Sequence, residues 1–185
     1  MRRLIPRECA VLVIDIQDKL AAAMPPAQLA EVTRASTLLL EAARLLGARA
    51  IATEQYPSGL GATIAPVASK LGAMGVAPIA KMAFSACDEA AFEQAWLRSS
   101  ARTAIVVGME SHVCVFQTVR ELAARGVTVL VPIDGVASRR DDHRAAGIDL
   151  CRSAGATVTT MESIVFDWLR QAGGDAFKQL SRLIR

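Results

Sequence analysis

The sequence predicts an α/β fold in which helices cover both faces of a doubly wound, mainly parallel sheet of six strands. Short aliphatic runs alternate with longer segments of helical periodicity along the 185 residues. Hydrophobic residues make up 52% of the chain and aromatic residues only 4%, so the core must consist chiefly of Ala, Val, Leu and Ile. A regular β-α-β alternation produces parallel strands with crossover helices, which gives three α/β/α layers.

The expected strands are aliphatic throughout, as strands covered on both faces should be. They are residues 9–16, 48–53, 76–81, 103–107, 127–131 and 156–159. The expected helices have apolar residues at helical spacing and often end at glycine, a common helix stop. They are residues 27–46, a segment from Asp88 as N-cap to about Arg98, a segment that carries Cys114 in its first turn and ends near Gly126, and residues 141–154, 163–170 and 175–185. A loop at 57–61 and a short helix separate the second and third strands.

The chain is expected to form one domain, residues 1–185, because it shows no linker, repeat or low-complexity segment. The core is expected at about residues 9–168, followed by a C-terminal helical tail at 175–185. The Leu- and Ile-rich tail either closes the chain's own core or supplies an interface to another subunit.

Composition and charge exclude several classes of partner. The net charge is only +3, and the densest basic spots, Arg2-Arg3 and Arg139-Arg140, lack neighbouring aromatic residues for base stacking, so no nucleic-acid partner is expected. The four cysteines form no CxxC pair, which favours reduced thiols in the cytosol. Neither a signal peptide nor a membrane span is recognisable. We therefore expect a cytoplasmic protein with a small-molecule substrate and no membrane partner.

Three reactive side chains lie at the ends of predicted strands. Asp15 closes the first strand, Lys81 closes the third, and Cys114 follows the fourth at the start of a helix. Ligands of doubly wound sheets bind beyond the carboxyl ends of the strands, so the three side chains share one crevice if the sheet order brings these strands together. The helix dipole and free backbone N–H groups at a helix start favour the thiolate form of Cys114.

The charges of these groups indicate a division of labour in nucleophilic catalysis. Cys114 is the nucleophile, Asp15 takes its proton and later delivers it to a leaving group, and Lys81 keeps Asp15 ionised. Backbone N–H groups of the turn at 108–114 are candidates for an oxyanion hole. Each residue also has a structural alternative: a small buried cysteine, a carboxylate that caps a turn, and a solvated lysine at a strand end.

Residues that flank the three reactive side chains are candidates to bind substrate. They are Gln17, Tyr56, Phe84 and His112. Phe84 is equally suited to the core, and His112 to a polar helix start. Asp134 and Arg139 are expected to organise the loop after the fifth strand rather than to contact substrate.

Three motifs, in this order, resemble the signatures of the isochorismatase-like cysteine hydrolases. They are Val13-Ile14-Asp15-Ile16-Gln17, Lys81-Met82-Ala83-Phe84-Ser85 and Gly108-Met109-Glu110-Ser111-His112-Val113-Cys114-Val115. The similarity extends from about Cys9 to Trp168, and segments 53–57 and 134–139 resemble the subgroup of isochorismatase-domain-containing proteins. The resemblance implies the Rossmann-like isochorismatase-like hydrolase fold and a homo-oligomer, since proteins of this fold commonly self-associate.

The resemblance also implies site residues. It implies a catalytic triad of Asp15, Lys81 and Cys114, and a cis peptide before Glu110 that aims the backbone amides of Glu110 and Cys114 at an oxyanion. Nicotinamidases of this superfamily bind a metal through an aspartate and two histidines after the second strand, whereas this chain has Glu-Gln-Tyr-Pro there and no histidine before His112. We therefore expect no metal and no other cofactor.

The sequence thus favours a metal-independent cysteine hydrolase that cleaves a small amide- or ester-like substrate, with C–N bond hydrolysis as the expected class, through a thioester on Cys114. Two alternatives stay open. One is a binding or assembly module with a vestigial site. The other is an isochorismatase-type vinyl-ether hydrolase, although true isochorismatases lack the nucleophilic cysteine.

Overall fold

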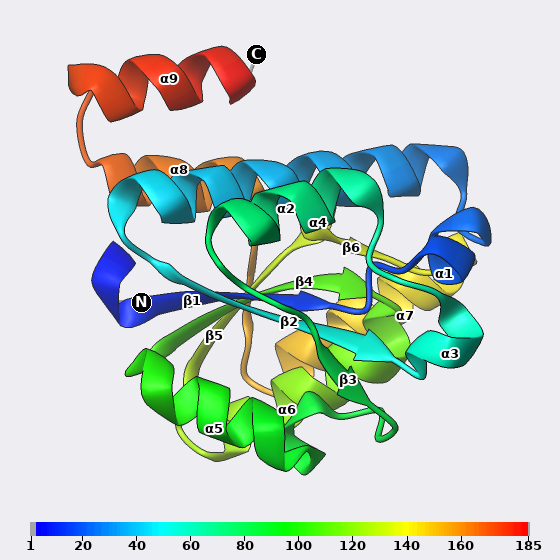
Figure 1. Ribbon diagram of the computed structural model, residues 1–185. Helices are drawn as coiled ribbons and strands as arrows, with labels where there is room; N and C mark the ends of the chain where they lie inside the picture. Colours follow the sequence, from blue (N-terminus) through cyan, green and yellow to red (C-terminus); the bar gives the residue numbers. More distant parts are fainter. Residues whose placement is uncertain (1–2, 185) are drawn as a thin grey trace.

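The computed structural model describes residues 3–184, and helices cover both faces of one sheet (Figure 1). The strands are β1 (Cys9–Ile14), β2 (Arg49–Gln55), β3 (Ile79–Lys81), β4 (Thr103–Met109), β5 (Thr128–Pro132), β6 (Val136–Ala137) and β7 (Thr157–Thr159). The helices are α1 (Asp18–Ala22), α2 (Pro26–Leu46), α3 (Pro57–Leu60), α4 (Ala65–Ala73), α5 (Ala90–Ser99), α6 (Phe116–Ala124), α7 (Asp141–Ser153), α8 (Met161–Leu169) and α9 (Gly174–Ile184).

The sheet is parallel and doubly wound, with the strand order β3-β2-β1-β4-β5-β7. This confirms the predicted fold class. The sheet has seven strands rather than six, because β6 also pairs with the end of β4. A strand of two residues is too short to produce a periodic pattern, so β6 could not be predicted.

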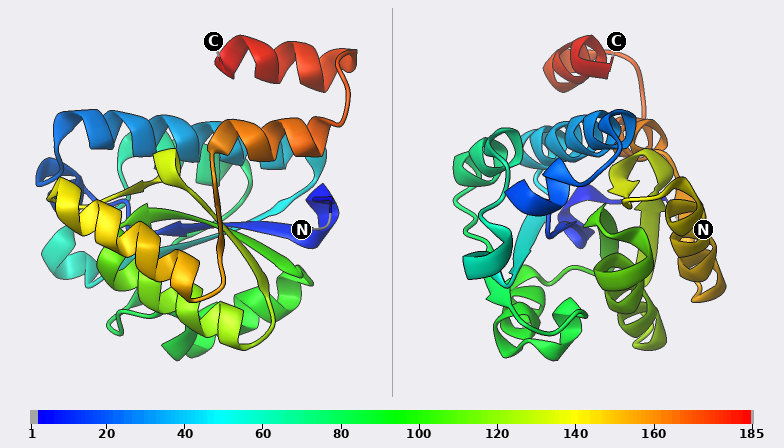
Figure 2. Two further views of the ribbon diagram at one scale, coloured as in Figure 1. Left: turned by 180° about the vertical axis from the view of Figure 1, so that it is seen from behind. Right: turned by 90° about the vertical axis from the view of Figure 1, so that its right-hand side faces the viewer.

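The central strand β1 connects the two halves of the core. All six of its residues are buried. Val11 and Val13 pack with side chains of α2, α4 and α8, whereas Leu12 and Ile14 pack with side chains of α5, α6 and α7. Figure 2 shows these two helical layers on opposite faces of the sheet, with α9 lying outside α2. Alternating aliphatic side chains on one strand therefore explain both layers.

Three local expectations were wrong in detail. The third strand begins at Ile79 rather than at residue 76, since Pro78 has no N–H to give to a ladder. Cys114 lies in a π-helical turn, Ser111–Val115, which precedes α6, and not in the first turn of an α-helix. Asp88 belongs to a 3-10 turn, and Glu89 is the residue that precedes α5.

Two glycines allow close approaches near the carboxyl end of the sheet. Gly108 of β4 has φ +138°, and a Cβ there would lie 2.0 Å from the carbonyl oxygen of Ile14 on β1. Gly147 of α7 lies against the π-helical turn, where a Cβ would lie 2.4 Å from Ser111 Oγ and 2.6 Å from the backbone nitrogen of His112. No side chain larger than hydrogen fits at either position without movement of the backbone beside it.

All four cysteines are free thiols, as predicted from their spacing, and all four are buried. None of the helices within residues 3–184 is long and apolar enough to cross a membrane. Helix α9 matches the predicted tail, packs on α2 and buries Leu180, while Arg185 and Arg2 lie outside the described residues.

Candidate active site

The three predicted reactive residues meet at the carboxyl end of the sheet. Asp15 directly follows β1 in the left-handed region with φ 52°, Lys81 is the last residue of β3, and Cys114 lies in the turn after β4. Their exposed fractions are 0%, 2% and 5%. Strand β2 separates β1 from β3, so the lysine reaches the aspartate across the end of β2.

Asp15 and Lys81 form a buried ion pair. Lys81 Nζ lies 2.8 Å from Asp15 Oδ2, and both side chains are fully inaccessible to solvent. Thr53 Oγ1 donates a hydrogen bond of 2.7 Å to Asp15 Oδ1. Lys81 Nζ also donates to the carbonyl oxygens of Ala83 and Phe84, each at 3.1 Å. A charge can be buried in this way only because it is paired and hydrogen-bonded.

Gln55, the last residue of β2, connects the ion pair with the thiol. Its Oε1 accepts a hydrogen bond from Lys81 Nζ at 2.6 Å and lies 3.9 Å from Cys114 Sγ. Its Nε2 donates to the carbonyl oxygen of Met82 at 2.8 Å, which fixes the amide with its oxygen toward the thiol. Sequence reasoning missed Gln55, although it ends a strand on the same edge and belongs to the segment 53–57 that resembles the family subgroup.

The pKa of the Cys114 thiol is raised to about 12, first by burial and then by the Asp15 carboxylate, against the opposing effect of Lys81. This direction is opposite to the preference for the thiolate that is expected at a helix start. The turn that holds Cys114 is π-helical and buried, so loss of solvation disfavours the thiolate. The resting thiol is protonated, so the group needs a base beside it to become a nucleophile.

Glu110 organises the turn between β4 and Cys114. The Met109–Glu110 peptide bond is cis, as the resemblance implied. Arg139 Nε lies 3.0 and 3.1 Å from the two carboxylate oxygens of Glu110, and the backbone N–H of Arg139 donates to Oε2 at 3.1 Å. Burial acts to raise the pKa of Glu110, but these hydrogen bonds outweigh it and hold the pKa below its usual value.

The loop after β5 is held by the two residues predicted to organise it. Arg139 does so through Glu110, and the Asp134 carboxylate accepts a hydrogen bond of 2.9 Å from the backbone N–H of Met161 at the start of α8. Both residues therefore anchor neighbouring elements, as expected.

Gln17 does not line a pocket, contrary to expectation. Its side chain is fully buried, its Nε2 donates to the carbonyl oxygens of Gln55 at 3.0 Å and Gly61 at 2.7 Å, and its Oε1 accepts from the backbone N–H of Gln55 at 2.8 Å. These contacts fasten the end of β2 to the following loop. Gln17 thus holds the backbone of Gln55 in place, and both polar atoms of its amide are already bonded to backbone groups.

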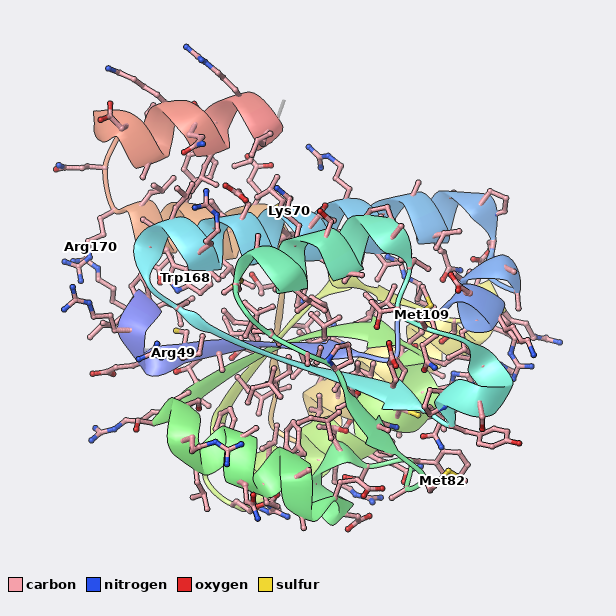
Figure 3. The ribbon with its side chains drawn as sticks, in the orientation of Figure 1. Arg49, Lys70, Met82, Met109, Trp168 and Arg170 are labelled. Atoms are coloured by element: carbon pink, nitrogen blue, oxygen red, sulfur yellow. The ribbon has the colours of Figure 1, made fainter. Side chains whose placement is uncertain are left out.

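Tyr56 and Phe84 are exposed aromatic residues next to the ends of β2 and β3. Their exposed fractions are 49% and 54%, so the alternative of a core role for Phe84 was wrong. Met82, labelled in Figure 3 on the loop after β3, is exposed as well. The three residues provide apolar contact area on the two loops that follow Gln55 and Lys81, and a role for Tyr56 and Phe84 in binding stays a prediction.

His112 is half-buried and contacts two residues that sequence reasoning missed. Its Nδ1 lies 3.1 Å from Ser138 Oγ, and its ring centroid lies 4.6 Å from that of His143. Burial lowers the pKa of His112, which favours the neutral ring. Ser138 also accepts a hydrogen bond from the Ser111 backbone N–H at 3.1 Å, so it joins the π-helical turn to the loop after β6. Within the described part of the chain, no group of three or more His, Cys, Asp or Glu side chains is arranged to hold a metal ion.

The chain is similar to known proteins over nearly its whole length. The family described as "Isochorismatase domain" matches residues 9–163. "Isochorismatase domain-containing protein 2A" of Mus musculus is 30% identical over 183 residues, which cover 99% of this chain and 85% of the relative. "Secreted isochorismatase effector Isc1" of Phytophthora sojae is 32% identical over 185 residues, or 99% of this chain and 87% of the relative. The solved structure of the MAR1 ribonuclease from Caenorhabditis elegans superimposes with a TM-score of 0.90 at 34% identity and covers 99% of this chain and 92% of its own.

Proposed function

The chain belongs to the isochorismatase family, and from that premise we propose that it is a cysteine hydrolase that cleaves a small amide- or ester-like substrate without a metal. The observation that carries the proposal is the contact of a buried ion pair, Asp15–Lys81, with a buried thiol through the Gln55 amide. A thiol with a raised pKa is a poor nucleophile alone, and a carboxylate beside it supplies the missing base.

In the first half of the proposed reaction, Asp15 takes the proton of Cys114 and the thiolate attacks the substrate carbonyl carbon. The backbone N–H groups of Glu110 and Cys114 bind the resulting oxyanion. When the tetrahedral intermediate collapses, Asp15 gives its proton to the departing amine or alcohol, and a thioester remains on Cys114. Lys81 holds Asp15 in place and balances its charge whenever the carboxylate is ionised.

In the second half, water attacks the thioester carbonyl while Asp15 accepts a proton from it. The thiol is regenerated with that proton, and the carboxylic acid leaves. Gln55 is a positioning residue in both halves, because its oxygen lies between Lys81 Nζ and Cys114 Sγ. Tyr56, Phe84 and His112 are proposed to contact the rest of the substrate.

The ribonuclease named among the similar structures raises RNA as a second substrate class. Two features of this chain speak against it. The guanidinium groups of Arg139 and Arg140 are each paired with a carboxylate, Glu110 and Asp142, so their charge is already balanced. The nucleophile is a buried thiol, whose exposed fraction of 5% suits a small acyl group better than a polymer backbone.

A trapping experiment tests the proposal. The protein is incubated with a panel of small primary amides and p-nitrophenyl esters, and adducts are located by peptide mass spectrometry. We expect acylation at Cys114, a loss of turnover of about a thousandfold or more in Cys114→Ala, and ordinary turnover in the matched control Cys87→Ala, which removes another buried thiol.

Three outcomes would contradict the proposal. Full turnover in Cys114→Ala favours vinyl-ether hydrolysis or another reaction without a thiol. Absence of any adduct and of any turnover favours a binding module with a vestigial site. Cleavage of a single-stranded RNA oligonucleotide that survives Cys114→Ala favours a ribonuclease.

The expected organisation and environment of the protein are proposals of the same kind. One domain, a homo-oligomer and a cytoplasmic location stay predictions, and sedimentation velocity and cell fractionation test the last two. One relative carries the word secreted in its name, which applies to that relative.

A further inference from the structure

The first half of β2 has a strand neighbour on one side only. Residues 49–53 pair with β1, but β3 pairs with β2 only from Thr53 to Gln55. The chain that leads into β3 contains Pro78, which cannot donate to a ladder. Among the described residues, Arg49 to Ala52 therefore form an open strand edge, remote from the reactive thiol at the other end of the sheet.

The backbone groups that face this open edge can be identified from the alternation of a strand. The Asp15 N–H donates to the Thr53 carbonyl oxygen at 3.2 Å, so Thr53 faces β1, and the Tyr56 N–H donates to the Lys81 carbonyl oxygen at 2.9 Å, so Tyr56 faces β3. Successive residues of a strand point their N–H and C=O groups to alternate sides. Ala50 and Ala52 hence face away from β1, and within residues 3–184 nothing pairs with the N–H and C=O of Ala50 or with the N–H of Ala52.

A groove of about 580 Å³ lies along these free groups. Its floor is the beginning of β2, and its walls are the segment after α4 and the C-terminal end of α5. Figure 3 labels Arg49 near the start of β2, above α5. Arg49 and Arg98 both line the groove, no acidic residue lines it, and neither arginine forms an ion pair with another described residue.

We propose that this groove binds an extended, acidic peptide segment of a partner protein, which adds to the sheet as a strand beside β2. Unpaired N–H and C=O groups at a sheet edge are the usual acceptor for such a segment, and main-chain hydrogen bonds supply its affinity. The two arginines complement acidic side chains on the segment. About four residues in strand conformation, roughly 13 Å, match the open length of β2.

The test uses the full chain and a fluorescein-labelled peptide with alternating acidic and β-branched residues, Glu-Val-Glu-Thr-Glu-Val, followed by fluorescence anisotropy. A peptide with lysine in place of each glutamate is the control. We expect the acidic peptide to bind, the lysine peptide to stay free, and amide exchange at Ala50 and Ala52 to slow in the complex. Ala50→Pro should weaken binding about tenfold or more, because proline removes a donor that faces the peptide and leaves the β1 side of the strand intact.

Two charge variants test the proposal even if Ala50→Pro does not fold. Arg98 is exposed on α5 and lines the groove, so Arg98→Glu should weaken peptide binding about fivefold. Arg182 is exposed on α9 and lies outside the groove, so Arg182→Glu should leave peptide binding unchanged. None of these variants should alter the proposed hydrolysis at Cys114.

Three results would overturn the proposal. The first is failure of the acidic peptide to bind the wild-type chain at about 1 mM, and the second is equal binding by the wild type and a folded Ala50→Pro. The third is a wild-type dimer in sedimentation velocity that becomes a monomer in Ala50→Pro without any peptide binding, which would assign the edge to a second copy of the chain.

Discussion

Replacement of Lys81 by methionine tests the Asp15–Lys81 ion pair most directly. The variant keeps most of the side-chain volume but leaves the carboxylate of Asp15, which is 0% exposed, without its cation. Two unit charges 2.8 Å apart attract by about 6 kcal/mol at an effective dielectric constant of about 20. Desolvation offsets part of this, and loss of one partner of a buried pair costs about 3–5 kcal/mol. That is a large share of the 5–15 kcal/mol that stabilises an ordinary domain.

Urea unfolding, followed by tryptophan fluorescence and by circular dichroism, measures this loss. We expect Lys81→Met to lower the free energy of unfolding by about 3–5 kcal/mol. The exposed control Lys178→Met should stay within about 0.5 kcal/mol of the wild type. The double variant Asp15→Asn with Lys81→Met contains no uncompensated charge. Its loss of stability should therefore be smaller, by about 2 kcal/mol or more, than the sum of the losses in the single variants Asp15→Asn and Lys81→Met. Additive losses, or a Lys81→Met variant as stable as the control, would refute the view that the two charges depend on each other.

Three further predictions follow from the geometry. Iodoacetamide should alkylate Cys114 slowly at pH 7 and faster as the pH rises toward about 12, because the raised pKa keeps the resting thiol protonated, and a rate that levels off near pH 9 in peptide mass spectrometry would contradict this. Gly147→Ala should destabilise the protein by about 1–3 kcal/mol, since its Cβ would lie 2.4 Å from Ser111 Oγ, and an unchanged thermal midpoint would disprove the close contact. The hydrogen bond from Arg44 lowers the pKa of Glu41 from 4.5 to about 2, so this carboxylate contributes stability above pH 4.5 that is lost as the pH falls to about 2. Glu41→Gln should remove that part of the acid dependence in urea titrations, and an unaltered pH profile would count against it.

Most of the fold, and the meeting of Asp15, Lys81 and Cys114 at one edge of the sheet, could be predicted because both depend on local patterns. Aliphatic runs ended by Asp15 and Lys81 indicated where the strands end, and parallel strands bring their carboxyl ends to one edge. The strand boundaries were less accurate, since Pro78 and the two-residue β6 affect pairing rather than periodicity.

The arrangement within the site depends on long-range packing, which a single sequence does not encode locally. Gln55 becomes part of the site only because β2 lies between β1 and β3, and Gln17 was misjudged because its amide is satisfied by backbone 38 residues away. The protonation of Cys114 depends on its burial in a π-helical turn and on Asp15, which comes from another strand. These contacts are set by the register of the sheet and not by any motif.

The position of Lys81 at the edge of the sheet has a dynamic consequence. It ends β3, a strand of three residues with a single neighbour, whereas Asp15 follows the fully paired central strand. Short edge segments open locally at a smaller free-energy cost than central strands do. We therefore expect β3 to open more often than the central strand β1. Hydrogen exchange at the amide of Tyr56, which bonds to the Lys81 carbonyl, reports that frequency, and an opening that exposes Lys81 would leave the buried carboxylate of Asp15 without its cation.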